Sequence, residues 1–406
     1  MSSGDTAWIL ISTALVMLMT PGLALFYGGM VRKKNVLSTM MMSFAILAVI
    51  GVLWVLYGYT LAFGPDKGGI IGGLDWIGLR NVGQGPSLYA PTVPHLAYMM
   101  FQGMFAIITV ALITGAVVER IKFSALLVFS VLWFTLIYCP VAHWVWGSGG
   151  WLAKLGALDF AGGTVVHICA GVSAMALALV LGPRKGFAEK HSMEPANIPM
   201  VALGAGLLWF GWFGFNAGSA LTSGGLAASA FVATNTSACA AAFTWIILGW
   251  INKRPSLLGA ATGAVVGLVA ITPAAGFVTP LAAIPIGMVA AVISYYFMIL
   301  RSKQNVDESL DVWACHGMGG TWGALATGIF ASATVNAAAT DGLIYGSALL
   351  LTKQLAAVAV VWVFAFAGTW ILAKIINAVI GLRVKSDEEV VGLDISQHGE
   401  KAYGGI

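Results

Sequence analysis

Long apolar stretches alternate with short polar connections along most of this chain. We count eleven stretches that are long enough to cross a bilayer, which takes about 20 helical residues. They cover 7–31, 36–63, 96–118, 124–142, 162–182, 197–218, 226–251, 256–274, 279–300, 312–332 and 346–382. We therefore predict an all-α polytopic membrane protein with eleven transmembrane helices, the last of them unusually long.

The basic residues predict how these helices are oriented. Of the twenty lysines and arginines, fifteen lie in one alternating set of connections and in the C-terminal tail, and three (Lys67, Arg80 and Lys154) lie in the opposite set. Cytoplasmic loops carry the excess of Lys and Arg in membrane proteins. The N-terminus is therefore expected outside and the C-terminus in the cytoplasm, with a long irregular outer loop at 64–95.

Composition agrees with this class and excludes others. Hydrophobic residues make up 59% of the chain and charged residues 9%, with a mean hydropathy of +0.90, whereas soluble domains are typically about 25% charged. The net charge of +4 rests on too few charges to indicate nucleic-acid binding. Nothing in the sequence predicts an enzyme, a cofactor or a metal site, because the cysteines are widely spaced within apolar stretches and no phosphate-binding loop is present.

The stretch 156–171 places two ionisable residues, Asp159 and His167, in an otherwise apolar segment. An ionisable group at membrane depth is a functional candidate by default. On a continuous helix the two residues would be separated by about 12 Å of rise and about 80° of rotation. The alternatives are that Asp159 caps the helix and that His167 is a buried histidine with a structural role only.

A second stretch repeats this pattern. LDFAGGTVVH begins one span and LDVWACHGMGG begins another, each with Leu-Asp followed by a histidine and small residues, so His316 matches His167. An odd number of spans in each repeat would invert the second copy. We predict inverted repeats at about 7–182 and 197–332, with 346–382 outside them, and both imidazoles near the middle of the membrane.

The topology also brings several polar and aromatic residues to the outer ends of their spans. Aromatic faces attract cations, and a serine hydroxyl accepts a hydrogen bond from a cation that carries N–H groups. Taken singly, each aromatic residue could be an anchor at the membrane interface. The residues that could line one outer vestibule are Phe101, Phe105, Trp146, Asp159, Phe215 and Ser219.

Several motifs in this order resemble the ammonium transporter family, Amt/MEP/Rh, on its prokaryotic Amt branch. They are ALFYGG at 24–29, FQGMF at 101–105, AHWVWG at 142–147, DFAGGTVVH at 159–167, GWFGFNAGS at 211–219, TPAAG at 272–276, CHGMGG at 315–320 and GLDISQHGEKAY at 392–403. The resemblance implies an eleven-helix bundle in the cell membrane, assembled as a homotrimer with a pore in each subunit.

The resemblance also implies roles for individual residues. An outer ammonium site would consist of Phe101, Phe105, Trp146 and Ser219, with Asp159 supporting it. Phe105 and Phe215 would form a gate beneath that site, and His167 and His316 would line the pore. The implied function is to recruit NH4+, with methylammonium as an analogue, to deprotonate it and to conduct NH3 for nitrogen uptake, the proton being relayed separately if at all.

The end of the chain is polar, which divides the protein into two parts. We predict a transporter domain at 1–383 and a cytoplasmic regulatory tail at 384–406. The resemblance implies that a PII-type nitrogen regulatory protein binds at this face. We expect the tail to dock on connections such as 184–190 and 301–303 through Asp394, His398, Glu400 and Tyr403. Val391 stands where relatives commonly carry an acidic residue.

Two other functions remain open at this point. An ion-coupled secondary transporter of a small amine or another solute would also use inverted repeats, although it usually needs a larger polar pocket. An ammonium sensor would bind the same cation without moving it. Uptake of labelled methylammonium separates these alternatives.

Overall fold

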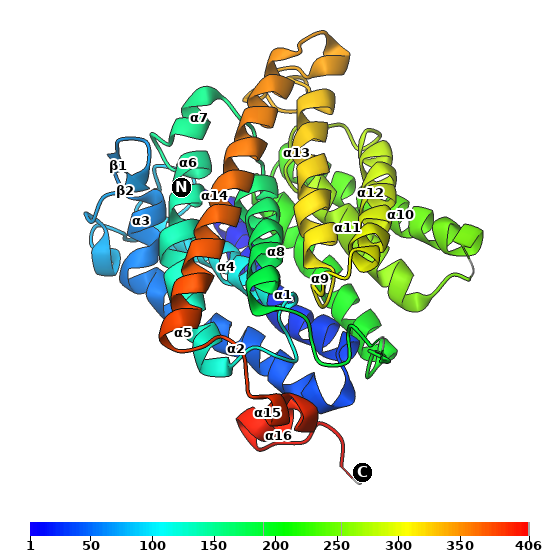
Figure 1. Ribbon diagram of the computed structural model, residues 1–406. Coiled ribbons are helices and arrows are strands. Elements are labelled where there is room, and N and C mark those ends of the chain that lie inside the picture. The colour runs from blue at the N-terminus through cyan, green and yellow to red at the C-terminus, as the bar shows by residue number, and fades with distance from the viewer. Residues whose placement is uncertain (190, 253, 405–406) are drawn as a thin grey trace.

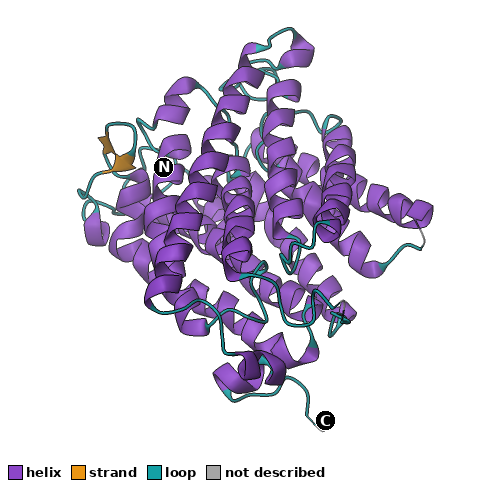
Figure 2. Ribbon diagram, viewed as in Figure 1, coloured by secondary structure: helices purple, strands orange, loops and turns teal. Residues whose placement is uncertain are grey.

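Helices make up almost all of the regular structure, as Figure 2 shows, with one small hairpin of two strands. The structure is a computed structural model that describes residues 1–189, 191–252 and 254–404. The helices of the first half are α1 (Ser3–Met30), α2 (Val36–Leu53), α3 (Tyr59–Phe63), α4 (His95–Thr114), α5 (Phe123–Trp133), α6 (Cys139–Trp146), α7 (Trp151–Leu155) and α8 (Cys169–Leu181). Those of the second half are α9 (Ile198–Gly218), α10 (Gly225–Asn252), α11 (Leu257–Ile271), α12 (Ala283–Lys303), α13 (Gly319–Phe330), α14 (Leu349–Val379), α15 (Ser386–Val391) and α16 (Leu393–His398).

In the described part of the chain, four π-helical segments interrupt these helices. They are η2 (Trp54–Gly58), η4 (Phe134–Tyr138), η5 (Gly163–Ile168) and η6 (Trp313–Met318). Short 3₁₀ turns occur at η1 (Lys33–Asn35), η3 (Ile77–Leu79) and η7 (Leu343–Tyr345). Both pore-candidate histidines lie in π-helical segments, which are rare and occur frequently at functional sites.

The apolar helices make this a polytopic all-helical membrane fold. Within the described residues, nine helical segments are long and apolar enough to cross a membrane. One further apolar helix, α11, is shorter, and η6 continues directly into α13. The prediction of a polytopic helical fold is confirmed, with about nine to eleven membrane-crossing helices.

Glycines allow the helices to pack closely at the core. A Cβ added to Gly263 of α11 would lie 2.6 Å from the Cβ of Trp245 on α10, which is closer than real Cβ atoms approach other atoms. A Cβ at Gly320 of α13 would lie 2.9 Å from that of His167 in η5. Small residues permit such approaches between membrane helices. This packing brings the two histidine-bearing segments together.

The outer loop is more ordered than the sequence suggests. Instead of an irregular loop at 64–95, the chain forms an antiparallel hairpin of β1 (Asp66–Lys67) and β2 (Ile71–Gly72), followed by η3. The Tyr89 hydroxyl donates a hydrogen bond to the Phe63 carbonyl oxygen at 2.7 Å. We call this end of the bundle, formed by 64–95 and 147–158, the hairpin face. The helices α15 and α16 lie at the opposite end (Figure 1).

That opposite end, which we call the tail face, is formed by 32–38, 119–123, 184–189, 191–197, 301–311 and 383–404. A chain of buried charges ties its connections together. Glu119 forms ion pairs of 2.9 Å with both Arg32 and Arg184, and Arg184 pairs with Asp307 at 2.8 Å. Burial alone would raise the pKa of Glu119, but Arg184 and Arg32 hold that pKa below its ordinary value.

Candidate functional site

A cavity of about 190 Å³ opens near the hairpin face. Three of the residues predicted for the outer site, Phe105, Trp146 and Ser219, line it together. Phe101 is fully buried and is not among the lining residues, although its ring centroid lies 4.9 Å from that of Phe105. The other residues that line this cavity were not predicted from the sequence, and they are Tyr89, Tyr98, Gln102, Phe160 and Leu221.

Hydrogen bonds fix the polar groups around this cavity. Ser219 follows the end of α9, and its hydroxyl donates to the Phe215 carbonyl oxygen at 2.8 Å. The Ser219 oxygen therefore keeps its lone pairs free to accept a hydrogen bond. The indole N–H of Trp146 donates to the backbone oxygen of Asp159 at 2.9 Å, so the ring is held in place beside the cavity.

Asp159 caps the backbone ahead of η5 and does not lie on a helix with His167. Its carboxylate accepts hydrogen bonds from the backbone N–H groups of Gly162, Gly163, Thr164 and Val165 at 2.7, 2.6, 2.8 and 3.2 Å, and from the Thr164 hydroxyl. The turn requires Gly162 at a φ of +118°, where side chains are rarely tolerated. The separation expected for a continuous helix is therefore wrong, and the capping alternative is the observed one.

Two phenylalanine rings lie between this cavity and the interior. The centroids of Phe105 and Phe215 are 4.3 Å apart with 35° between the ring planes. Both rings are almost completely buried. Phe105 also meets Trp146 edge-on, with centroids 5.9 Å apart. A solute in the cavity can pass further inward along this line only if one of the stacked rings moves.

The two histidines lie directly behind these rings. The Nδ1 atoms of His167 and His316 are 3.2 Å apart, within hydrogen-bonding distance. The Nε2 atom of His167 is buried and has no partner within the described residues. A cavity of about 10 Å³, close to the minimum for one water molecule, adjoins both rings together with Phe215 and Trp212. The inverted repeats predicted both imidazoles near the middle of the membrane, and in the structure the two rings lie side by side.

The shared proton between the Nδ1 atoms fixes the chemistry of the other two nitrogens. One neutral ring must supply an Nδ1–H and the other a lone pair. The ring that donates at Nδ1 then has a lone pair at Nε2, and its partner has an N–H at Nε2. The pair therefore offers one acceptor and one donor to a small molecule beside it, whichever ring takes which role.

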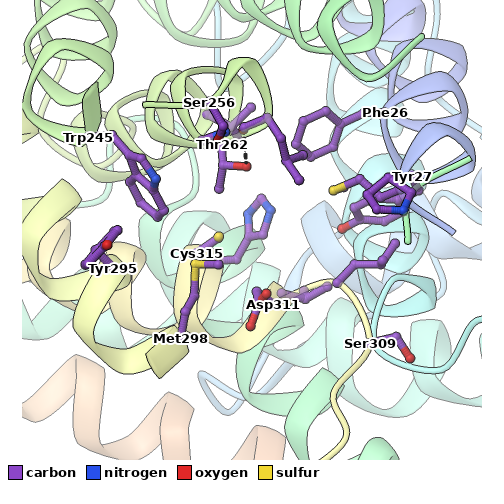
Figure 3. A pocket seen from close by; sticks show the side chains of 18 of the residues that line it. Phe26, Tyr27, Trp245, Ser256, Thr262, Tyr295, Met298, Ser309, Asp311 and Cys315 are labelled. Atoms are coloured by element: carbon purple, nitrogen blue, oxygen red, sulfur yellow. Dashed lines mark hydrogen bonds between the residues drawn. The ribbon is translucent and has the colours of Figure 1, made fainter. Parts of the chain in front are cut away.

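A wider cavity of about 480 Å³ lies on the tail-face side of His316. It shares Phe26, Val265 and His316 with the narrow cavity, so the two are adjacent. Figure 3 shows polar and aromatic side chains from several helices turned toward it. Asp311 in its wall is paired with Arg301 at 2.7 Å. No sequence pattern indicates this cavity, because its residues come from spans that are distant in the sequence.

The tail makes specific contacts with the tail face. The Asp394 carboxylate accepts a hydrogen bond from the Ser38 N–H at 2.7 Å, which caps the start of α2. The ring centroids of His398 and Phe123 lie 4.9 Å apart. The Tyr403 hydroxyl accepts from the Asn197 side-chain amide at 3.4 Å.

The predicted partners of the tail need correction. Within the described residues the tail makes no hydrogen bond to 301–303, and the side chain of Glu400 makes none at all. The expected contact to 184–190 is represented by Glu389, which accepts from the Lys185 N–H at 2.6 Å. Residue 190 lies outside the described residues. The tail docks mainly on the connections that open α2, α5 and α9, because the chain leaves α14 beside them.

A bundle of long apolar helices that holds a narrow, buried cavity between two wider ones is characteristic of a polytopic membrane transport protein. The chain belongs to the Ammonium Transporter Family, whose model matches residues 7–403. It is 54% identical to an ammonium transporter of Bacillus subtilis over 99% of both chains. It is 53% identical to the ammonium transporter Amt1 of Archaeoglobus fulgidus, over 99% of this chain and all of that one.

Solved structures agree with this assignment. The crystal structure of Mep2 from Candida albicans matches with a TM-score of 0.91 at 36% identity, covering 99% of this chain and 90% of that one. A structure titled Sensor Amt Protein matches with a TM-score of 0.90 at 28% identity, covering 97% and 98%. The curated relatives named above are described as ammonium transporters.

Proposed function

We propose that this protein takes up ammonium across the cell membrane for nitrogen assimilation. It binds NH4+ in the cavity lined by Phe105, Trp146 and Ser219, removes a proton, and conducts NH3 past His167 and His316. The observation that carries the proposal is the pair of imidazoles in a cavity too small for a hydrated ion.

Selectivity follows from the dryness of that narrow cavity. Ammonium and potassium ions are similar in size, so a rigid opening does not separate them. Moving an ammonium-sized ion from water into a medium of low dielectric constant has an idealised Born cost of about 20 kcal/mol. Ammonium avoids this cost by giving up its proton and crossing as neutral NH3, whereas potassium has no proton to give.

Each group has a separate role in this scheme. The aromatic faces and the Ser219 oxygen attract the cation, and Asp159 holds the turn whose backbone oxygen accepts the Trp146 indole N–H. Opening of the stacked Phe105 and Phe215 rings admits the solute. The free Nε2 positions of the paired imidazoles then hydrogen bond NH3 and offer a separate route for its proton.

We further propose the finer topology. The nine long apolar segments, together with α11 and the η6–α13 pair, make eleven spans. The tail face is cytoplasmic and the hairpin face external, because fifteen of the twenty basic residues lie on the tail side. Residues 1–383 then form the transporter domain, with inverted repeats at about 7–182 and 197–332, and 384–406 form the regulatory tail of each subunit in a homotrimer.

Transport by purified protein in liposomes tests this function. We expect uptake of labelled methylammonium that ammonium competes for and that needs no gradient of another ion. Currents on a solid-supported membrane, measured with the flux, show whether charge moves with the solute. Dependence on a sodium gradient would favour a coupled amine transporter, and binding without uptake would favour a sensor.

We also propose that the tail regulates transport and accompanies binding of a PII-type nitrogen regulatory protein at the tail face. Truncation after Lys385 removes the Glu389 contact to the Lys185 N–H and the Asp394 cap on α2. We expect the truncated protein to transport methylammonium at a lower rate and to lose co-purification with PII protein. Both are measured on matched membrane preparations.

Two point variants provide the control. Asp394→Ala removes the carboxylate that caps α2, whereas Glu400→Gln alters a tail side chain that makes no hydrogen bond within the described residues. The first should behave like the truncation and the second like the intact protein. If truncation changed neither uptake nor PII binding, the tail would have no regulatory role.

A further inference from the structure

The buried His143 links the outer hairpin to the helix that carries Trp146. It lies on α6, three positions before Trp146, and none of its surface is exposed. Its Nδ1 atom lies 2.9 Å from the Ala62 backbone oxygen near the end of α3, and its Nε2 atom lies 3.0 Å from the Asp66 Oδ1 atom of β1. The hairpin packs beside α3 and α6, as Figure 1 shows. Both ring nitrogens are therefore within hydrogen-bonding distance of an oxygen.

Both of these oxygens can only accept a hydrogen bond. A backbone carbonyl has no proton to give, and the Asp66 carboxylate also accepts the Gly69 N–H at 2.6 Å and lies 3.5 Å from the Lys154 ammonium group. The hydrogen bond from His143 holds the pKa of Asp66 below its ordinary value, so this carboxylate is ionised. A neutral imidazole has one N–H and one lone pair, so it would turn a lone pair toward one of the two oxygens. The imidazolium donates at both nitrogens and satisfies both contacts.

The surroundings of the ring favour this charged form. Asp66 is the charged group in contact with His143, and the mostly exposed Lys154 of α7 lies at the other oxygen of the same carboxylate. Ala62 lies in the last turn of α3, where carbonyl groups lack a donor within the helix. A buried charge is costly unless it is paired and hydrogen-bonded. His143 has both kinds of partner.

The same segments hold the wall of the outer cavity. Tyr89 lines this cavity, and its hydroxyl donates to the Phe63 backbone oxygen at 2.7 Å and accepts the Ser148 N–H at 2.9 Å. Phe63 ends α3, and Ser148 lies just after α6. His143 therefore joins α3 to α6 close to the place where Tyr89 joins them. Loss of the His143 links would let Trp146 and Tyr89, which both line the cavity, shift relative to each other.

We propose that His143 is held as an imidazolium, with Asp66 as its counter-ion, and acts as a positioning residue of the outer site. It fixes α6 against α3 and the hairpin, so that Trp146 and Tyr89 keep their places beside the cavity. The inference rests on the proposed outer site and extends it to a charged pair that does not touch the substrate.

Nitrogen NMR spectra of histidine-labelled protein near neutral pH test the charge. The two nitrogens of an imidazolium both carry a proton and resonate close together, whereas those of a neutral ring resonate far apart. The His143 signals are assigned by their absence from His143→Phe, and we expect an imidazolium. Asp66→Asn removes the charge of the counter-ion at constant size, so the ring should become neutral in this variant. A neutral His143 in the intact protein would overturn the proposal.

Uptake of methylammonium into liposomes tests the positioning role. We expect His143→Phe to raise the KM about fivefold, through partial loss of the cation–π attraction at Trp146, with the maximal rate unchanged. Asp66→Asn should raise the KM as well, and adding it to His143→Phe should raise the KM no further, because the two residues act through one contact. Lys154→Gln is the matched control. It removes an exposed charge from the same carboxylate, where a surface pair contributes little, and should keep the intact KM.

Trp146→Leu distinguishes failure of this inference from failure of the outer site. If His143→Phe and Asp66→Asn kept the intact KM while Trp146→Leu raised it, the outer site would stand and the positioning role of His143 would be refuted. If Trp146→Leu kept the intact KM too, the proposed outer site would be wrong as well. A lower maximal rate at constant KM would leave His143 a purely structural residue and overturn the proposal. If His143→Phe failed to fold, Asp66→Asn on the hairpin would decide by the same two measurements.

Discussion

Replacement of Asp159 by alanine is expected to abolish methylammonium uptake, leaving no rate above that of empty liposomes. The carboxylate accepts hydrogen bonds from four backbone N–H groups and from the Thr164 hydroxyl. Leaving a buried donor without a partner costs about 1–3 kcal/mol. The turn at 159–165 would lose several partners at once and would not keep its conformation.

Loss of this turn would disturb both the outer cavity and the histidine pair. The backbone oxygen of Asp159 receives the Trp146 indole N–H, and His167 follows the same turn in η5. Trp146→Leu, in contrast, removes a cation–π contribution of about 0.5–2 kcal/mol and one hydrogen bond to the turn, while the Asp159 carboxylate keeps all its donors. We therefore expect residual uptake in Trp146→Leu and none in Asp159→Ala.

Asp159→Asn is the matched control, because it keeps one acceptor oxygen in the same position. It should retain a monodisperse elution profile in detergent and recover part of the uptake if capping is the main role of the carboxylate. Equal residual activity in Asp159→Ala and Trp146→Leu would contradict this ordering. A fully active Asp159→Ala protein would remove the residue from the proposed mechanism.

Features that depend on a local pattern or on an internal repeat could be predicted from the sequence. Apolar length alone predicts the membrane-crossing helices. The match between the segments around His167 and His316 placed both near the middle of the membrane, and their Nδ1 atoms lie 3.2 Å apart. Phe105, Trp146 and Ser219, placed at the same end of their spans by the topology, line one cavity.

Features set by contacts between distant segments could not be predicted in this way. The turn at Asp159 depends on a positive φ at Gly162, so the helical spacing assumed for the segment failed. The tail meets Ser38 and Phe123, more than 270 positions away in the chain, and no local pattern marks such partners. Gln102, which lines the outer cavity, could have been noticed in the sequence, because it is a polar residue within an apolar span and stands four positions after Tyr98.

Removal of either pore imidazole is expected to cost the protein its discrimination between ammonium and potassium. His167→Ala and His316→Ala each eliminate the Nδ1 contact and leave space beside a cavity that now has a volume of about 10 Å³. That space would admit several water molecules, because a water needs only about 10–15 Å³ of such volume. A hydrated path lowers the cost of moving an intact cation, so K+ should pass together with NH4+.

The two variants should differ in a way that reflects where each ring lies. His316 also borders the 480 Å³ cavity, so His316→Ala joins that cavity to the narrow one, whereas His167→Ala enlarges the narrow cavity alone beneath the Phe105–Phe215 stack. We therefore expect the larger K+ current from His316→Ala, recorded on a solid-supported membrane beside the ammonium current. His191→Ala, at an exposed position in the connection before α9, is the matched control and should keep the selectivity of the intact protein. If both pore variants rejected K+ and moved ammonium at the intact rate, the paired imidazoles would not be the basis of selectivity, and the Phe105–Phe215 stack would be the next candidate.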